Sequence, residues 1–138
     1  MKFRKTVILF TLFLSICVIA GCSTKDLPGK KVEQEKIIVT FEDKNRNVLA
    51  TGADLDSVFV SVSKDEQYLI SGKFKEAKKL EEITQKLLGK ELLIYCNEDL
   101  IASPVINGAL RTGDFSIAGG FTLKEASEWV YMIKKSME

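Results

Sequence analysis

The chain of 138 residues contains no histidine, and this absence excludes two common kinds of functional site. Without an imidazole, neither catalysis by a Cys-His pair nor a metal site with histidine ligands is available. The sequence also lacks a Ser-Lys motif and a glycine-rich phosphate loop, and its scattered carboxylates are typical of solvated helices and loops. We therefore predict no catalytic residues, no metal ligands and no cofactor, and a protein that is not an enzyme.

An excess of positive charge is lacking too. The full chain has 20 basic and 19 acidic residues, and three of the basic residues, but no acidic one, lie within the first 21 positions. Removal of that segment would leave 17 basic against 19 acidic residues, a net charge of −2. The remaining lysines are interleaved with glutamates and form no basic patch that could hold phosphate backbones, so we predict no nucleic-acid partner.

The first 21 residues have the pattern of an export signal. Residues 1–5 carry three positive charges, and residues 6–20 are almost entirely apolar. A basic start, an apolar run too short to cross a bilayer comfortably, and small residues at the cleavage point mark a signal peptide, here residues 1–21. The end of this segment and the cysteine after it have the form of a lipobox: Ile19, Ala20, Gly21 and Cys22.

In a lipobox the small residues admit the peptidase, and the cysteine thiol receives a diacylglyceryl group. We therefore predict a protein held by lipid on Cys22 at the extracytoplasmic face of the cell membrane. Each buried methylene contributes about 0.8 kcal/mol to membrane binding. Two or three acyl chains therefore give stable anchoring, whereas a single chain binds reversibly. The alternatives are an ordinary signal peptide, or an uncleaved anchor, that happens to contain a cysteine.

Cysteine is scarce beyond this anchor. Cys17 would leave with the signal and Cys22 would be acylated, so Cys96 remains as the single free thiol. An exported domain with one thiol has no internal disulfide and must draw its stability from its core. Residues 22–35 are polar and aperiodic, which is typical of a flexible tether that reaches on the order of 20 Å.

Residues 36–138 have the apolar periodicity of a single α+β domain. A period of three to four predicts helices at 76–88, closed by Gly89, and from Thr122 onward, where Glu125 completes a capping box. We predict one mostly antiparallel sheet with these two amphipathic helices packed on it. Alternating or β-branched runs predict its strands at 36–41, 48–50, 57–63, 68–74, 91–96, 99–105 and 114–118.

Several stretches of this domain share a pattern with a known family. They are residues 48–55 (VLATGADL), 92–94 (LLI), 101–107 (IASPVIN) and 116–126 (SIAGGFTLKEA). Together they resemble the head of the large extracytoplasmic loop of SecD, a membrane subunit of protein export. That family typically has V-L-L-T-G-E-D-L, then S-A-P-V-I-N, then I-S-G-x-F-T-x-x-E-A. The resemblance covers roughly residues 36–138 and implies the same fold.

The sequence departs from that family in three respects, the simplest being that Ser and Ala before Pro104 are exchanged. The family's Asp-Gly turn is Asn97-Glu98 here, and because glutamate resists the positive φ of a type I′ turn, we expect another turn type. In SecD the head is joined to a base and to transmembrane helices, and residues 36–138 contain neither. We therefore expect a stand-alone lipoprotein in which a lipid takes the place of the membrane domain.

The resemblance implies contact with polypeptide that emerges from the translocon. We predict that the protein binds exported or unfolded polypeptide, or the Sec translocon itself, by sheet-edge pairing near residues 104–107 and by apolar contacts. The candidate binding residues are Pro104, Asn107 and Phe115. The alternative is a lipoprotein that uses this fold to bind a small molecule or a cell-envelope fragment. A deep pocket of mixed polarity would favour that alternative, and a shallow apolar groove beside an exposed edge would favour polypeptide.

Overall fold

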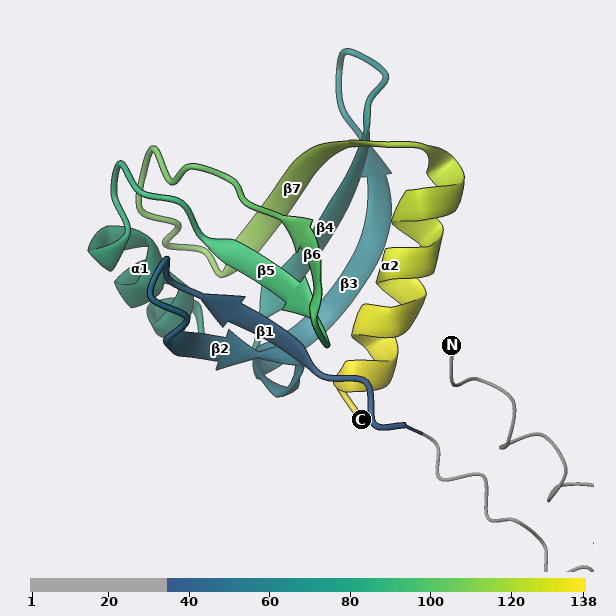
Figure 1. Ribbon diagram of the computed structural model, residues 1–138. Helices are drawn as coiled ribbons and strands as arrows, with labels where there is room; N and C mark the ends of the chain where they lie inside the picture. The colour runs from purple at the N-terminus through teal and green to yellow at the C-terminus, as the bar shows by residue number, and fades with distance from the viewer. Residues whose placement is uncertain (1–34) are drawn as a thin grey trace, which may run out of the picture. The chain divides into compact units, whose positions relative to one another are not determined.

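The structure, a computed structural model, describes residues 35–138. The predicted signal peptide, the lipobox with Cys22 and the tether up to residue 34 lie outside the described residues. The described part has no helix that is both long and apolar enough to cross a membrane. The elements follow in this order (Figure 1): β1 (Val39–Glu42), β2 (Val48–Thr51), a 3₁₀ turn η1 (Gly52–Asp54), β3 (Leu55–Val62), β4 (Tyr68–Phe74), α1 (Ala77–Lys86), β5 (Leu93–Cys96), β6 (Asp99–Ala102), β7 (Asp114–Phe121) and α2 (Leu123–Ser136).

The strands form two antiparallel sheets, where the sequence predicted one. A four-stranded sheet has the order β2-β1-β5-β6, and a three-stranded sheet has the order β3-β4-β7. The two helices, of 10 and 14 residues, are too short to cover the apolar faces of all these strands. The sheets instead cover each other, because each must bury its apolar face against another layer. Figure 1 places α1 and α2 at opposite ends of the sheets.

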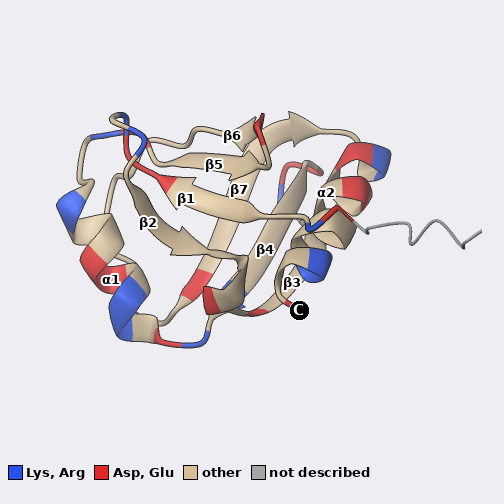
Figure 2. Cartoon of the chain, turned by 60° about the horizontal axis from the view of Figure 1, so that its bottom comes forward, with Lys and Arg blue, Asp and Glu red and all other residues tan. Residues whose placement is uncertain are grey.

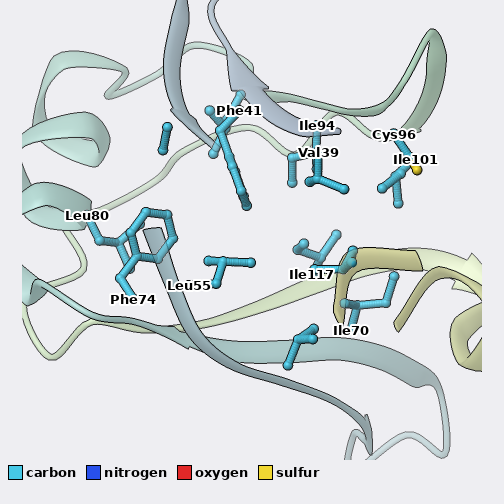
Figure 3. Close-up of a cluster of buried hydrophobic side chains, with 14 of the residues drawn as sticks. Val39, Phe41, Leu55, Ile70, Phe74, Leu80, Ile94, Cys96, Ile101 and Ile117 are labelled. Atoms are coloured by element: carbon cyan, nitrogen blue, oxygen red, sulfur yellow. The ribbon is translucent and has the colours of Figure 1, made fainter. Parts of the chain in front are cut away.

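The core lies between the two sheets, as Figure 3 shows. From the four-stranded sheet come Val39, Phe41, Ile94 and Cys96, and from the three-stranded sheet come Leu55, Ile70, Phe74 and Ile117, all of them buried. Cys96 packs as a small apolar residue, as predicted, and burial raises the pKa of its thiol. A buried, protonated thiol is a poor nucleophile, so this cysteine contributes packing rather than chemistry.

The predicted hairpin between residues 57–63 and 68–74 is confirmed as β3 and β4. The two strands pair in register through Val60 and Ile70, and a tight turn joins Ser63 to Gln67. The turn between β5 and β6 has a positive φ at Asn97 but not at Glu98. A type I′ turn needs a positive φ at both positions, so the turn is of another type, as the glutamate predicted.

The helix boundaries follow their predicted signals closely. Gly89 adopts the predicted positive φ, of 73°, although α1 itself ends before it, at Lys86. The capping box of α2 is present: the Thr122 hydroxyl accepts from the Glu125 amide at 3.2 Å, and the Glu125 carboxylate accepts from the Thr122 amide at 2.8 Å. The backbone and side-chain hydrogen bonds from Thr122 lower the pKa of the Glu125 carboxyl. Charged residues gather on the helices and turns (Figure 2).

The predicted polar turn between β1 and β2 is built on one carboxylate. Asp43 accepts from the Asn45 amide at 2.8 Å, and from the backbone and side chain of Asn47 at 3.0 and 2.9 Å. The side-chain bond from Asn47 contributes most to a pKa of Asp43 below the ordinary value of 3.8. Because the folded-state pKa is the lower one, the charged carboxylate stabilises the fold above the ordinary pKa, and this contribution is lost as the pH falls through the folded-state value.

Replacing Asp43 with asparagine is therefore expected to reduce the loss of folding stability that occurs when the pH is lowered. Urea unfolding at about pH 7 and about pH 3 should show a smaller difference in the variant than in the native protein. Asp65→Asn, in the exposed turn between β3 and β4, serves as the control for the removal of one negative charge. The same acid loss in the Asp43 variant and the native protein would contradict this account.

Candidate binding site

A cavity of about 320 Å³ opens at the α1 end of the core. Its floor is formed by Phe41, Phe74 and Phe115, and its walls include Leu80 of α1 and Leu92 before β5. Residues 104–110, which connect β6 towards β7, form its rim. Every residue that lines the cavity is uncharged, and most are apolar. The site is therefore suited to an apolar, uncharged group.

The three phenylalanines of the floor pack edge to face. The ring of Phe41 lies 5.5 Å from that of Phe74 and 6.3 Å from that of Phe115, and Phe74 and Phe115 are 5.8 Å apart. Edge-to-face aromatic pairs stabilise a fold by more than the burial of their surface area alone would predict. Phe41 and Phe74 are buried, whereas Phe115 is half-buried, so its ring is the part of the floor that an entering group meets.

Gly72 makes room for the Phe115 ring. The two residues are opposite each other in the β4–β7 register. A Cβ at position 72 would lie 2.6 Å from the tip of the Phe115 ring and 2.4 Å from the Ser57 carbonyl oxygen, far inside van der Waals contact. No role for Gly72 was predicted from the sequence, although an isolated glycine inside a strand is a known signal of close approach.

Backbone hydrogen bonds hold the rim in place. The Leu92 amide donates to the Pro104 carbonyl at 2.9 Å, and Ile106 exchanges bonds with Gly89 and Lys90 at 2.8 and 2.9 Å. The strand expected at 99–105 ends at Ala102 in β6, since proline cannot donate to a ladder, and the chain then pairs with residues 88–92 instead. Residues 104–107 were predicted to form an open sheet edge, but part of their backbone is thus already hydrogen-bonded to residues 89–92.

Thr84 fastens the rim to α1. Its side chain is fully buried, and its hydroxyl donates to the Leu80 carbonyl at 2.8 Å and accepts from the Leu110 amide at 2.9 Å. A side-chain hydroxyl of α1 therefore provides the hydrogen-bond acceptor for a backbone amide of the rim. Sequence reasoning missed this residue, which is a polar position within the apolar stripe that contains Leu80, Ile83 and Leu87.

Replacing Thr84 with valine, which has nearly the same shape, is expected to destabilise the domain by about 1–3 kcal/mol, because the Leu110 amide loses its partner. Urea unfolding measures the loss, and hydrogen exchange at Leu110 should become faster. Thr84→Ser, which keeps the hydroxyl, should retain slow exchange at Leu110. Unchanged exchange in the valine variant would show that the hydroxyl does not hold the rim.

The structure brings all three predicted binding residues to one place. Pro104 and Asn107 lie on the rim and Phe115 on the floor of the same cavity, although 11 positions separate the first from the last. Their role in binding stays a prediction. In residues 35–138 there is no group of three or more Cys, Asp or Glu side chains placed to hold a metal ion.

Two curated relatives illustrate the likeness in sequence. The chain is 32% identical over 91 residues to the protein translocase subunit SecD of Rickettsia typhi, a match that covers 64% of this chain and 18% of the relative. It is 33% identical over 104 residues to the translocase subunit SecDF of Thermus thermophilus, covering 74% of this chain and 14% of the relative. The chain thus spans less than a fifth of the length of either relative.

The fold is shared with solved SecDF structures. SecDF in its super-membrane-facing form superposes with a TM-score of 0.65 at 22% identity, over 72% of this chain and 19% of that one. A second SecDF structure, of a membrane component that enhances protein export, gives a TM-score of 0.64 at 22% identity and covers 80% of this chain and 71% of that one. The family model described as the SecDF P1 head subdomain matches residues 27–136, and the chain therefore belongs to the SecDF P1 head family.

Proposed function

We propose that this chain is a lipid-anchored extracytoplasmic protein that binds exported or unfolded polypeptide, or the protein-export machinery, without catalysing a reaction. The observation that carries the proposal is the uncharged, mostly apolar cavity whose rim and floor contain Pro104, Asn107 and Phe115. Membership of the SecDF P1 head family supports it, because a solved relative is described as enhancing protein export.

The cavity has the chemistry that an unfolded chain needs from a partner. A folded protein buries its large apolar side chains, whereas an unfolded chain exposes them to water. Transfer of such a side chain onto the phenylalanine floor removes apolar surface from water. The favourable free energy is about 25 cal/mol for each Å² that is buried. Because no charged residue lines the cavity, an apolar side chain can enter without stripping water from a charge.

Site-specific photo-crosslinking in living cells tests the proposal. The probe replaces Asn107 or the half-exposed Val105 at the cavity, and replaces Glu82 on the exposed face of α1 as the control. We expect adducts with translocon subunits or with many exported chains from the two cavity positions and not from Glu82. Equal adducts from all three positions, or none from the cavity, would contradict the proposal.

A small molecule or a cell-envelope fragment is the second candidate ligand. The observation that favours it is the volume of about 320 Å³, which lies within the range of small-ligand pockets. Thermal unfolding in the presence of soluble envelope fragments separates the two candidates. A raised Tm with a discrete fragment, and no crosslinks to polypeptide, would favour the small ligand.

A further inference from the structure

β7 is an open edge of the three-stranded sheet. It pairs with β4 on one side, and in the part of the chain that the structure describes no backbone hydrogen bond joins its other side to a strand. The regular β4–β7 ladder runs from Asp114 to Ala118 and is followed by a bulge. The outer side of this run therefore has amide and carbonyl groups that are free to pair with another extended chain.

β7 has a longer edge than the outer strands β2 and β6, and it packs against β6 of the facing sheet and against α2. β2 and β6 are only four residues long, and α2 packs along β3. Natural edges are commonly blocked by lysine, proline or a covering helix. After Asp114, β7 contains no charged residue and no proline, and Figure 2 shows it uncharged beyond that end. An edge of this length without lysine or proline is able to pair with another extended chain.

The cavity opens along this same strand. Phe115, Ser116 and Ile117 of β7 all line it, opposite the rim of residues 104–110. Side chains of a strand alternate between the two faces of the sheet, so every second side chain of an added strand would lie on the inner face with Phe115 and Ile117. The edge and the cavity are therefore placed to bind the main chain and a side chain of one ligand together.

We infer that the edge of β7 at residues 114–118 pairs with an extended polypeptide segment, and that the cavity receives one large apolar side chain of that segment. This inference rests on the proposed function and places the pairing edge on β7, in place of residues 104–107. The ligand class follows from the chemistry: free main-chain groups at strand spacing are matched by another main chain, and an uncharged cavity selects an uncharged side chain.

Peptides with blocked amides test the inference. The protein is the chain from Cys22 onward with Cys22→Ser, which cannot be acylated, and the probe is a fluorescent, uncharged peptide of about nine residues with a central phenylalanine. Two derivatives carry N-methyl groups on alternate residues, one set for each edge of the peptide. Their side chains are identical, so only the main-chain bonds differ. We expect one derivative to bind about tenfold more weakly or worse and the other to bind nearly as the parent does, since only one edge of the peptide faces β7.

The outcomes separate this inference from the proposed function. If the parent peptide binds and both derivatives bind equally well, pairing at β7 is wrong and polypeptide binding stands. If neither the parent peptide nor a set of unrelated apolar peptides binds, polypeptide recognition itself is wrong.

A charged edge provides a matched test on the protein. Ala118 is exposed on β7, and Ala118→Lys adds a long charged side chain at the edge. Ala53→Lys makes the same change at an exposed position in η1. We expect the first variant to lose peptide affinity at least about tenfold and the second to keep it, with both folded by circular dichroism. Equal affinities of the two variants would contradict pairing at β7.

Discussion

Replacing Gly72 with alanine is expected to destabilise the domain by about 3 kcal/mol, the largest effect we expect from a single methyl group in this protein. The added Cβ would lie 2.4 Å from the Ser57 carbonyl oxygen and 2.6 Å from the Phe115 ring. Real Cβ atoms do not approach other atoms so closely, so one of the two neighbours has to move. The Ser57 oxygen belongs to the backbone of β3 and is held in the ladder with β4.

The Phe115 ring is the neighbour that can move, and its displacement would change the cavity. The ring forms the half-buried part of the floor, in edge contact with Phe41 and Phe74. A shift towards the rim would fill the cavity, so Gly72→Ala should weaken ligand binding as well as folding. A loss of stability without any change in binding would show that the Phe115 ring does not shape the site.

Gly108 supplies the matched control. It also lines the cavity, but a Cβ built there meets no atom within 4 Å. Gly108→Ala should therefore change the free energy of unfolding by no more than about 0.5 kcal/mol. Urea unfolding of both variants measures the contrast, and equal unfolding midpoints would contradict the steric argument.

The features that sequence predicted well are local ones. The capping box of Thr122 and Glu125 depends on residues three positions apart, and the β3–β4 hairpin depends on two adjacent alternating runs. Propensity, spacing and turn residues act within such short segments, so the pattern and the structure agree. The positive φ at Gly89 belongs to the same class.

The division into two sheets could not be predicted from local sequence patterns. Alternation indicates which face of a strand is buried, but it does not indicate which strand lies beside it. β1 pairs with β5, so that Val39 is opposite Cys96, 57 positions away in the sequence. That pairing removes β1 and its neighbour β2 from the β3–β4 hairpin and gives a second sheet. The cavity is lined by residues of both sheets, among them Phe41 of β1 and Phe74 of β4.

The candidate site was therefore predicted in part. The SecD resemblance covers Pro104 and Asn107, and Phe115 was predicted as an apolar contact, whereas no sequence pattern indicated the cavity that the three residues line. Gly72 and Thr84 act through a close approach and a buried hydrogen bond to distant residues. Neither contact has a periodic signature, so only the three-dimensional arrangement shows what these residues do.

Replacing Cys22 with serine is expected to abolish incorporation of labelled palmitate and to leave the signal peptide uncleaved, so that the protein accumulates as its full-length precursor. A serine hydroxyl in the lipobox does not receive the diacylglyceryl group, so the acyl chains that we propose as the anchor are lost. Each chain of about 16 carbons contributes on the order of 10 kcal/mol of membrane affinity, at about 0.8 kcal/mol for each methylene.

Cys17→Ser is the control, since Cys17 lies five positions earlier, within the segment that the peptidase would remove. Labelling and fractionation should be unchanged in this variant, because the lipobox at residues 19–22 is intact. Export without any lipid labelling in the native protein would favour an ordinary signal peptide. The full-length Cys22→Ser precursor stays in the membrane through its apolar segment, because an unacylated precursor is not cleaved, so fractionation alone does not separate a lipoprotein from an uncleaved anchor. Loss of labelling at Cys22 distinguishes the two cases: an uncleaved apolar anchor predicts no label in the native protein, whereas a lipoprotein predicts label that depends on this one thiol.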